Sequence, residues 1–231
     1  MVFHGLQKMT LLDFPGKVAT TLFTGGCNLR CPFCHNAFLV TRIDNSSVYS
    51  EEEILKFLGT RTGLLDGICI TGGEPLMQND IASFIKKVKD MGFALKLDTN
   101  GCYPDKLKSL IDEGLLDYVA MDIKNSKEKY AKTVGIPELD LTPIEKSVEI
   151  LKEKKVNYEF RTTVIKEFHE LEDFSEIGEW IKGADRYFLQ GFTDSGNLIG
   201  ENMNPVSKKE MEKMRDLASK YVPFCEIRGV D

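Results

Sequence analysis

Residues 18–34 read Val18-Ala-Thr-Thr-Leu-Phe-Thr-Gly-Gly-Cys27-Asn-Leu-Arg-Cys31-Pro-Phe-Cys34. The apolar and β-branched residues 18–23 predict a strand, and this strand leads into a loop with a C-x3-C-x2-C array. A [4Fe-4S] cluster normally takes four thiolates, so three thiolates on one loop leave one iron without a protein ligand. Because that iron can bind and reduce a small molecule, the array predicts chemistry as well as electron storage.

A structural zinc site is the main alternative for these cysteines. Such sites take four protein ligands, usually as two separated pairs. His35 could be the fourth ligand, but it follows Cys34 directly, which strains a tetrahedral site, and the sequence has no second C-x2-C pair. The array therefore favours an iron–sulfur cluster over zinc, or over three cysteines without a metal. The predicted metal ligands are Cys27, Cys31 and Cys34.

Composition narrows the class of protein. The 231 residues are 42% hydrophobic, which suits one domain with a sizeable core. With 36 acidic and 30 basic residues the net charge is −6, so we expect no nucleic-acid partner. The remaining cysteines, Cys69, Cys102 and Cys225, are scattered and do not suggest a disulfide framework. The N-terminus lacks signal-peptide features and no apolar run is long enough for a membrane span, so we expect a cytoplasmic protein without a membrane partner.

Strand-like and helix-like segments alternate along the chain in about six units. Such alternation pairs strands in parallel through right-handed crossovers. The predicted fold class is α/β, a partial (β/α)6 barrel, as a single domain over residues 1–231. Residues 1–16 would form an N-terminal extension or hairpin, and residues 17–231 the partial barrel. The predicted strands lie at residues 18–23, 67–71, 93–97, 118–123, 158–165 and 187–190, with 222–227 as a candidate closing strand.

Polar motifs follow these strands where each one ends, and in (β/α) barrels the loops after the strands carry the site. Taken singly, each motif has an ordinary explanation, such as a strand-to-helix turn, an Asx turn or a surface ion pair. Their convergence on one rim is what predicts a site. Besides the cysteine loop, the motifs are Thr71-Gly72-Gly73-Glu74-Pro75, Asp98-Thr99-Asn100-Gly101, Asp122-Ile123-Lys124, Arg161 and Gln190-Gly191.

The motifs offer the groups that hold an α-amino acid beside a cluster. The glycines of Gly72-Gly73 let backbone approach a ligand closely, and Glu74 can meet an ammonium group. Lys124 shares a strand face with Asp122 and can hold a carboxylate, as can Arg161. S-adenosylmethionine is an amino acid of this kind, with a reducible sulfonium.

The chain resembles the radical S-adenosylmethionine superfamily. The cysteine array with Phe33 before its last cysteine is that superfamily's signature, and Gly72-Gly73-Glu74-Pro75 is similar to its motif for the methionine amino group. Cys34-His35-Asn36, Asp98-Thr99-Asn100-Gly101 and Asp122-Ile123-Lys124 resemble the activating enzymes of glycyl-radical enzymes. Phe3-His-Gly-Leu-Gln-Lys and Asp13-Phe14-Pro15-Gly16 are most similar to activating proteins of anaerobic ribonucleoside-triphosphate reductase.

The resemblance implies two cofactors, one [4Fe-4S] cluster on the three cysteines and S-adenosyl-L-methionine. It implies that Lys124 and Arg161 face the cofactor carboxylate, and that His35 and Asn36 lie beside the cluster, although simple loop packing suits His35 equally well. Asp98, Thr99 and Asp122 match positions near a possible monovalent cation. No catalytic residue is expected beyond the cluster and cofactor. The predicted cofactor-binding residues are Phe33, His35, Asn36, Gly72, Gly73, Glu74, Asp98, Asn100, Asp122, Lys124 and Arg161.

The implied activity is that of a radical oxidoreductase. Flavodoxin or ferredoxin would supply an electron, S-adenosylmethionine would be cleaved to methionine and a 5′-deoxyadenosyl radical, and this radical would take a hydrogen atom from a glycine of the partner reductase. Cys69 is the sole cysteine between Cys34 and Gly72, so no second cluster is expected.

Three other functions remain open. The partner could be a pyruvate formate-lyase-type enzyme, or the substrate could be a small molecule, as in 7-carboxy-7-deazaguanine synthase. The non-enzymatic alternative is an iron–sulfur electron carrier or a metal-sensing module. A carrier should have a cluster with four cysteine ligands and needs neither Glu74 nor Lys124.

Overall fold

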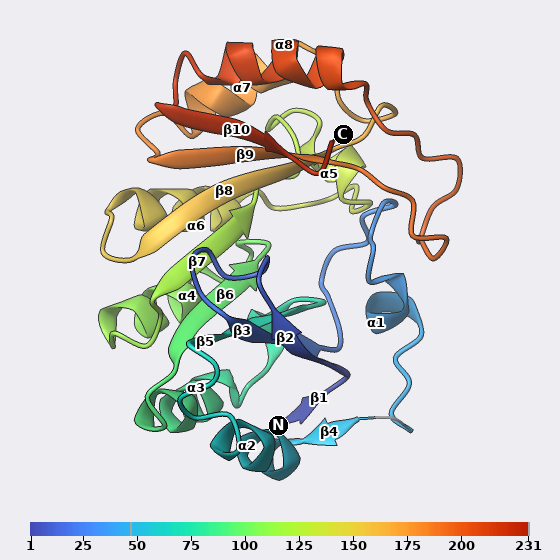
Figure 1. The fold of residues 1–231 in the computed structure, drawn as a ribbon. Helices are drawn as coiled ribbons and strands as arrows, with labels where there is room; N and C mark the ends of the chain where they lie inside the picture. Colours follow the sequence, from blue (N-terminus) through green and yellow to red (C-terminus); the bar gives the residue numbers. More distant parts are fainter. Residues whose placement is uncertain (47, 231) are drawn as a thin grey trace.

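One eight-stranded sheet forms the centre of the protein in the computed structural model, which describes residues 1–46 and 48–230 (Figure 1). A separate antiparallel pair joins the short strands β1 (Val2–Phe3) and β4 (Tyr49–Ser50). The strands of the large sheet are β2 (Gly5–Thr10), β3 (Ala19–Thr24), β5 (Gly67–Gly72), β6 (Ala94–Thr99), β7 (Tyr118–Asp122), β8 (Asn157–Val164), β9 (Arg186–Gly191) and β10 (Phe224–Arg228).

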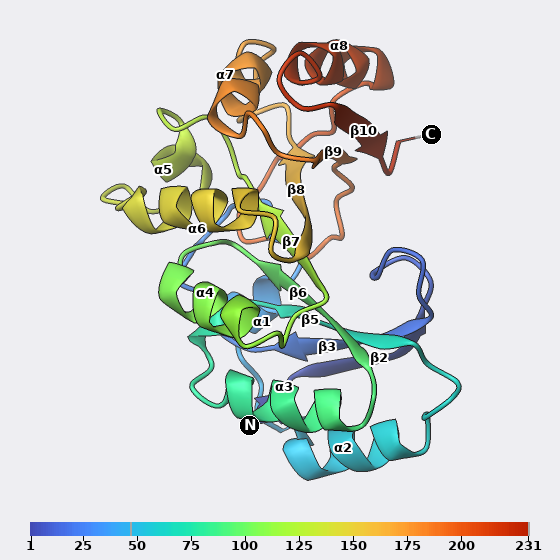
Figure 2. The same ribbon diagram turned by 90° about the vertical axis from the view of Figure 1, so that its left-hand side faces the viewer.

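From β3 onward, helices join successive strands, and Figure 2 shows α3, α4, α6 and α7 stacked along one side of the sheet. None of the described helices has the length and apolar character needed to cross a membrane. The helices are α1 (Ala37–Thr41), α2 (Glu51–Gly59), α3 (Ile81–Asp90), α4 (Pro104–Asp112), α5 (Tyr130–Thr133), α6 (Thr142–Lys152), α7 (Asp173–Trp180) and α8 (Lys208–Ala218), with a 3-10 turn η1 at Pro75–Met77.

The strand order is β10-β9-β8-β7-β6-β5-β3-β2, and every neighbouring pair is parallel except β2 with β3. The predicted α/β fold with a partial barrel is therefore confirmed. The candidate closing segment forms β10, which pairs with β9 and lies at the edge of the sheet. It lengthens the sheet, so within residues 1–46 and 48–230 the sheet has two edges and does not close.

Alternation along the strands separates the core from the concave inner face. On β6, Leu95 and Leu97 are fully buried beneath the helices, while Lys96 and Asp98 point to the opposite face. Local sequence signals define the helix ends: Ser50 and Glu53 form a capping box at the start of α2. The core therefore lies between sheet and helices, and the inner face is left for polar side chains.

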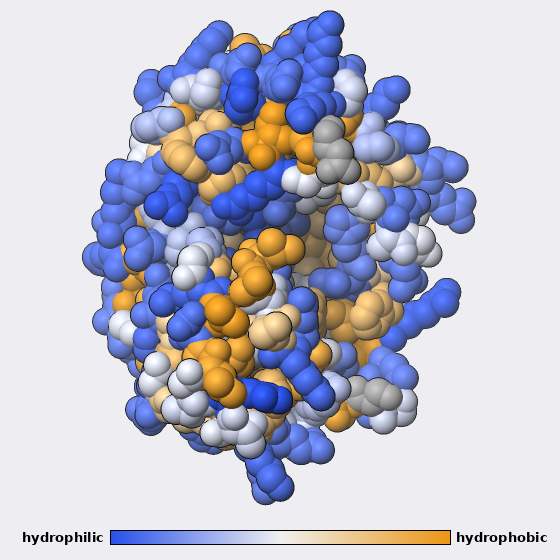
Figure 3. All heavy atoms as spheres, viewed as in Figure 1, coloured by the Kyte–Doolittle hydropathy of each residue, from blue (hydrophilic) through white to orange (hydrophobic). Residues whose placement is uncertain are grey.

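The β2–β3 hairpin folds its tip against the inner face. Asp13 accepts a hydrogen bond of 2.5 Å from the Thr21 hydroxyl, and Phe14 packs on Tyr118 with ring centroids 6.2 Å apart. Leu11 and Leu12 are 68% and 90% exposed at the same tip. Figure 3 shows hydrophobic side chains gathered near the centre of this face of the molecule. The hairpin thus covers the amino-terminal side of the sheet and presents two leucines to solvent.

Candidate active site

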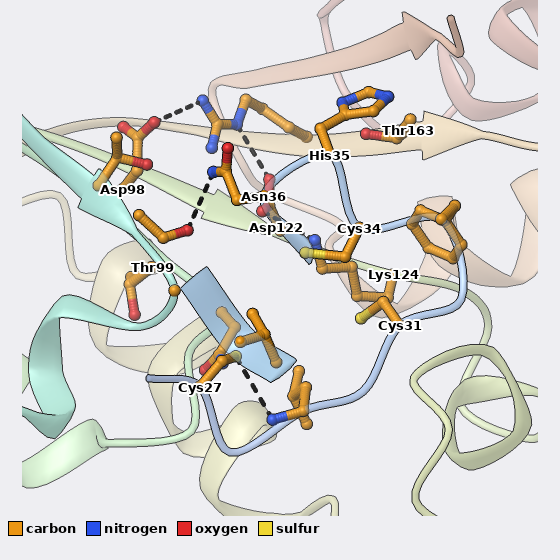
Figure 4. Close-up of a pocket in the computed structure, with 18 of the residues that line it drawn as sticks. Cys27, Cys31, Cys34, His35, Asn36, Asp98, Thr99, Asp122, Lys124 and Thr163 are labelled. Atoms are coloured by element: carbon orange, nitrogen blue, oxygen red, sulfur yellow. Dashed lines mark hydrogen bonds and ion pairs between the residues drawn. The ribbon is translucent and has the colours of Figure 1, made fainter. Parts of the chain in front are cut away.

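One cavity of about 230 Å³ lies at the carboxyl ends of the central strands (Figure 4). Almost all of the predicted site residues line it, although they come from five separate stretches of the chain. Those lining it are Cys27, Cys31, Phe33, Cys34, His35, Asn36, Gly72, Gly73, Asp98, Asn100, Asp122, Lys124 and Arg161.

Hydrogen bonds to backbone carbonyls hold the cysteine loop in shape around this cavity. The Arg30 guanidinium donates to the carbonyls of Cys27 and Leu29 over 2.6 and 2.8 Å, and the Cys34 amide donates to the Cys31 carbonyl over 3.1 Å. Figure 4 shows the three cysteines around the cavity, and the positive charge of Lys124 acts on both Cys31 and Cys34. The loop therefore presents three sulfur atoms to one space.

The chemistry of these donors fits an iron–sulfur cluster. Among the described residues, no three His, Cys, Asp or Glu side chains are grouped closely enough to hold a single metal ion. Three soft thiolates spread around a cavity instead suit a larger cluster, which argues against the zinc alternative. Burial raises the pKa of Cys31 to about 12 despite the opposing effect of Lys124. Cluster binding must therefore release protons from this loop.

The Gly72-Gly73 turn brings strand β5 against the cysteine loop. Gly72 has φ +124°, and a Cβ on it would lie 2.3 Å from Thr24 backbone atoms. A Cβ on Gly73 would lie 1.9 Å from the Gly26 carbonyl oxygen. The Asn36 side chain donates to the Gly72 carbonyl over 3.1 Å. Only glycine allows this close approach, so the two glycines let the turn pack directly against the cysteine loop.

Glu74 lies behind the cavity, and its carboxylate does not reach the lining. The side chain is fully buried and accepts hydrogen bonds from the Thr99 hydroxyl at 2.8 Å and the Asn100 amide at 2.7 Å. It also caps the turn at the Leu76 amide over 3.0 Å. Burial raises the pKa of Glu74 to about 7. In this structure Glu74 therefore joins two motifs, whereas the sequence suggested direct contact with a ligand ammonium.

Asn100 continues this connection to the cysteine loop. Its side-chain nitrogen donates to Asn28 Oδ1 over 2.9 Å and lies 3.7 Å from Cys27 Sγ. The chain of contacts therefore runs from Glu74 through Asn100 to Cys27, a predicted cluster ligand. It ties the position of the turn that carries Glu74 to that of the cysteine loop.

Arg161 stands at the centre of a buried group of charges. Its Nη1 donates to Asp98 Oδ2 over 3.1 Å, and its Nε donates to Asp122 Oδ1 over 3.0 Å. The other Asp98 oxygen accepts from Lys96, and the other Asp122 oxygen accepts from Lys124 over 2.9 Å. These positive neighbours hold the pKa of Asp122 at about 2 against the effect of burial. Both aspartates are therefore ionised, and Lys124 and Arg161 remain beside the cavity as cations.

The residues expected near a monovalent cation do not fit such an ion. Each of the four oxygens of Asp98 and Asp122 already accepts from a cationic nitrogen. The Thr99 hydroxyl is turned away and donates to Glu74. The cation expected at these three residues therefore stays a prediction, and in this structure protein cations already contact all four carboxylate oxygens.

S-adenosylmethionine, in contrast, fits what the cavity offers. The cavity combines a glycine turn, cationic groups for a carboxylate and apolar walls. Three of its lining residues, Leu29, Val40 and Thr163, were missed in the sequence. Thr163 follows Arg161 by two positions on β8 and shares its face, a signal that could have found it. Leu29 and Val40 carry no such signal.

His35 packs against a neighbouring ring at the wall of the cavity, and its role beside the cluster stays a prediction. It lines the cavity, and its ring stacks on Phe192 with centroids 5.5 Å apart and planes 11° apart. The stacking fixes the imidazole at the wall of the cavity, next to Cys34.

Comparison with known proteins agrees with this geometry. The family model of the radical SAM superfamily matches residues 21–181, which is more than half of the sequence. The chain therefore belongs to the radical SAM superfamily. Its predicted class, a radical SAM enzyme of the activating-enzyme type, is confirmed, as are the predicted [4Fe-4S] cluster and S-adenosylmethionine cofactors.

Individual relatives refine the comparison. A Methanocaldococcus jannaschii protein that carries the name of a glycyl-radical enzyme activating enzyme is 30% identical over 98% of this chain and 95% of its own length. The pyruvate formate-lyase-activating enzyme of Clostridium pasteurianum is 30% identical over 53% of this chain and 52% of its own. The crystal structure of Streptococcus suis SuiB has a TM-score of 0.70 and 13% identity over 91% of this chain and 48% of SuiB. The chain thus spans about half the length of the last two proteins, and SuiB shows the fold alone.

Proposed function

We propose that this enzyme generates a glycyl radical on an anaerobic ribonucleoside-triphosphate reductase by reductive cleavage of S-adenosylmethionine. The observation that carries the proposal is the convergence, at one cavity, of three thiols, a glycine turn and two cations for a carboxylate. Near full-length similarity to a protein named as an activating enzyme supports the reaction type.

The residues of the cavity would divide the work of binding. Cys27, Cys31 and Cys34 would hold the cluster, and Lys124 and Arg161 would hold the cofactor carboxylate. When bound, the cluster and S-adenosylmethionine supply one-electron reductive cleavage and a hydrogen-abstracting radical. The protein's part is to orient the cofactor and to exclude water around it.

A second cavity supports a protein as the substrate. It has a volume of about 580 Å³ and shares Asp98, Arg161 and Gln190 with the first. Leu11 and Leu12 of the hairpin tip line it on one side, and the residues of the β10 end, Arg228 and Gly229, also belong to its wall. The open side of the sheet thus gives a route by which a chain segment carrying glycine could reach the cofactor.

The choice of reductase rests on the hairpin. Its motif residues Asp13 and Phe14 contact Thr21 and Tyr118 of the sheet. These contacts hold the hairpin tip so that Leu11 and Leu12 lie exposed beside the second cavity. A pyruvate formate-lyase-type partner is the second candidate, favoured by the similarity to the Clostridium pasteurianum enzyme. Flavodoxin or ferredoxin is the proposed electron donor.

Electron paramagnetic resonance tests the proposal. Reconstituted enzyme, reductant, S-adenosylmethionine and a candidate reductase are mixed without oxygen. The proposal expects a glycyl doublet that is absent when S-adenosylmethionine is omitted. A doublet formed only with a pyruvate formate-lyase-type protein would move the assignment to the second candidate. No doublet with either protein, but turnover of a small molecule, would reject a protein substrate.

A further inference from the structure

Lys96 is a buried lysine for which the proposed reaction has no use. It lies on β6, two residues before Asp98, and therefore shares the inner face of the sheet with it. Its side chain is only 2% exposed. Lys96 borders the second cavity and does not line the first, so it stands behind Asp98 as seen from the proposed cofactor. A buried ammonium is unfavourable unless it is paired, which raises the question of what it does there.

The pairing of Lys96 completes a closed set of charges. Its Nζ binds Asp98 Oδ1, while Arg161 takes Asp98 Oδ2 and bridges to Asp122. Lys124 takes the last carboxylate oxygen. Each of the four carboxylate oxygens therefore faces one cationic nitrogen.

The charge balance of this set suits one bound carboxylate. Three cations, Lys96, Arg161 and Lys124, against two carboxylates leave a single positive charge. One cofactor carboxylate neutralises that charge. An added sodium or potassium ion would place a further positive charge within the same buried group, where charge repulsion is poorly screened.

We propose that the Lys96 ammonium is the built-in cation of this buried group of charges, and that it takes the place of a monovalent metal ion behind Asp98. The inference rests on the proposed placement of S-adenosylmethionine in the first cavity. It concerns binding of the cofactor alone and needs no partner enzyme.

Lys96 acts through Asp98, so it is a positioning residue. It holds one Asp98 oxygen, which leaves the other oxygen to orient the Arg161 guanidinium toward Asp122 and the cavity. Burial lowers the pKa of Lys96, but Asp98 more than offsets this, and the net pKa lies above its ordinary value. The ammonium is therefore charged at neutral pH.

The test measures S-adenosylmethionine binding by calorimetry in choline, sodium, potassium or ammonium chloride at equal ionic strength. Wild-type affinity should agree within about twofold in all four salts. Lys96→Met keeps the apolar part of the side chain but ends one atom earlier, so it removes the charge and vacates the Nζ position. In choline it should bind roughly tenfold more weakly, and potassium or ammonium should restore much of the loss by occupying the vacated position.

Lys182→Met is the matched control. Lys182 is 63% exposed and, among the described residues, forms an ion pair only with Glu179, so its loss should leave binding unchanged in every salt. Thermal unfolding of the protein without cluster gives a second readout. The unfolding midpoint of Lys96→Met should rise in potassium relative to choline, while that of the wild type should not. This readout remains usable where Lys96→Met fails to accept the cluster.

Three results would overturn the inference. The first is wild-type binding that weakens severalfold in choline, because a metal ion would then be needed beside Lys96. The second is Lys96→Met binding in choline as tightly as the wild type. The third is a weakened Lys96→Met that no monovalent cation restores in binding or in unfolding, which would mean a purely structural role. Failure of the wild type to bind S-adenosylmethionine in any salt would instead reject the proposed function.

Discussion

Asp122 and Arg161 are directly paired residues of the neighbouring strands β7 and β8, and Nε of Arg161 donates to Oδ1 of Asp122 over 3.0 Å. The pairing fixes the guanidinium so that its Nη1 reaches Asp98 on the next strand, β6. Sheet register thus brings three separate sequence positions together as one charged group in the wall of the first cavity.

Removal of the Arg161 guanidinium, which bridges Asp98 and Asp122, should destabilise the protein. Arg161→Met leaves each aspartate with a single lysine partner, so we expect a loss of about 3 kcal/mol, at the low end for breaking a buried ion pair. Urea unfolding of the protein without cluster measures the loss. Arg161→Lys should lose less, because it keeps the charge without the bidentate geometry. If Arg161→Met unfolds with the same free energy as the wild type, the two ion pairs of Arg161 contribute nothing to stability.

Cys31→Ala should lose most of its iron and acid-labile sulfide after reconstitution, because two thiolates remain where three are needed. Cys225→Ala is the control, since Cys225 lies on the edge strand β10 and does not line the cavity. Chemical analysis of iron and sulfide per chain compares the two variants. Equal loss in both, or full iron content in Cys31→Ala, would contradict the ligand assignment.

Gly73→Ala should disrupt the contact between the glycine turn and the cysteine loop. The new Cβ would lie 1.9 Å from the Gly26 carbonyl oxygen, and the forced movement should cost about 3 kcal/mol and reduce cluster uptake. Gly92→Ala is the comparison: its φ is +88° but nothing lies within 4 Å of the new Cβ, so backbone strain alone should cost about 1 kcal/mol. Denaturant unfolding measures the loss of unfolding free energy in each variant. A smaller loss in Gly73→Ala than in Gly92→Ala would be inconsistent with the structure.

Glu74 should make stability fall as pH rises through weakly acidic values. Its pKa is about 7 in the folded protein and 4.5 as the reference value, so the folded state retains a proton that the unfolded state has lost. Relative to the non-titrating Glu74→Gln, the wild type should lose about 3 kcal/mol between these two pH values and change little above pH 7.

Urea unfolding of both proteins across this range provides the measurement. Glu74 accepts three hydrogen bonds, which favour its ionised form. A wild type that gains stability relative to Glu74→Gln as pH rises would show that these bonds outweigh burial.

Local patterns were enough to predict much of this site. The spacing of Cys27, Cys31 and Cys34 and the positions of motifs at strand ends depend on neighbours in sequence, and the parallel order of the strands brings those ends to one rim. All of the predicted residues except Glu74 consequently line one cavity.

The remaining features depend on contacts between distant residues. In the sequence, Lys96 is simply one residue of a short strand. Its role depends on Arg161, which lies on another strand and donates to the second oxygen of Asp98. Glu74 was expected to face a ligand, but its carboxylate is held by the Asn100 amide, which follows the end of the next strand, β6. Leu29 and Val40 are apolar residues whose place in the wall follows from the path of the cysteine loop alone.

The most direct test of the central claim follows one hydrogen atom. The partner reductase is prepared with deuterated glycine, and 5′-deoxyadenosine from the anaerobic reaction is analysed by mass spectrometry. The account predicts one deuterium in 5′-deoxyadenosine, in step with the glycyl radical signal, because the radical made at this cavity takes its hydrogen from the partner's glycine. 5′-Deoxyadenosine without deuterium, in a sample where the glycyl radical forms, would contradict the account.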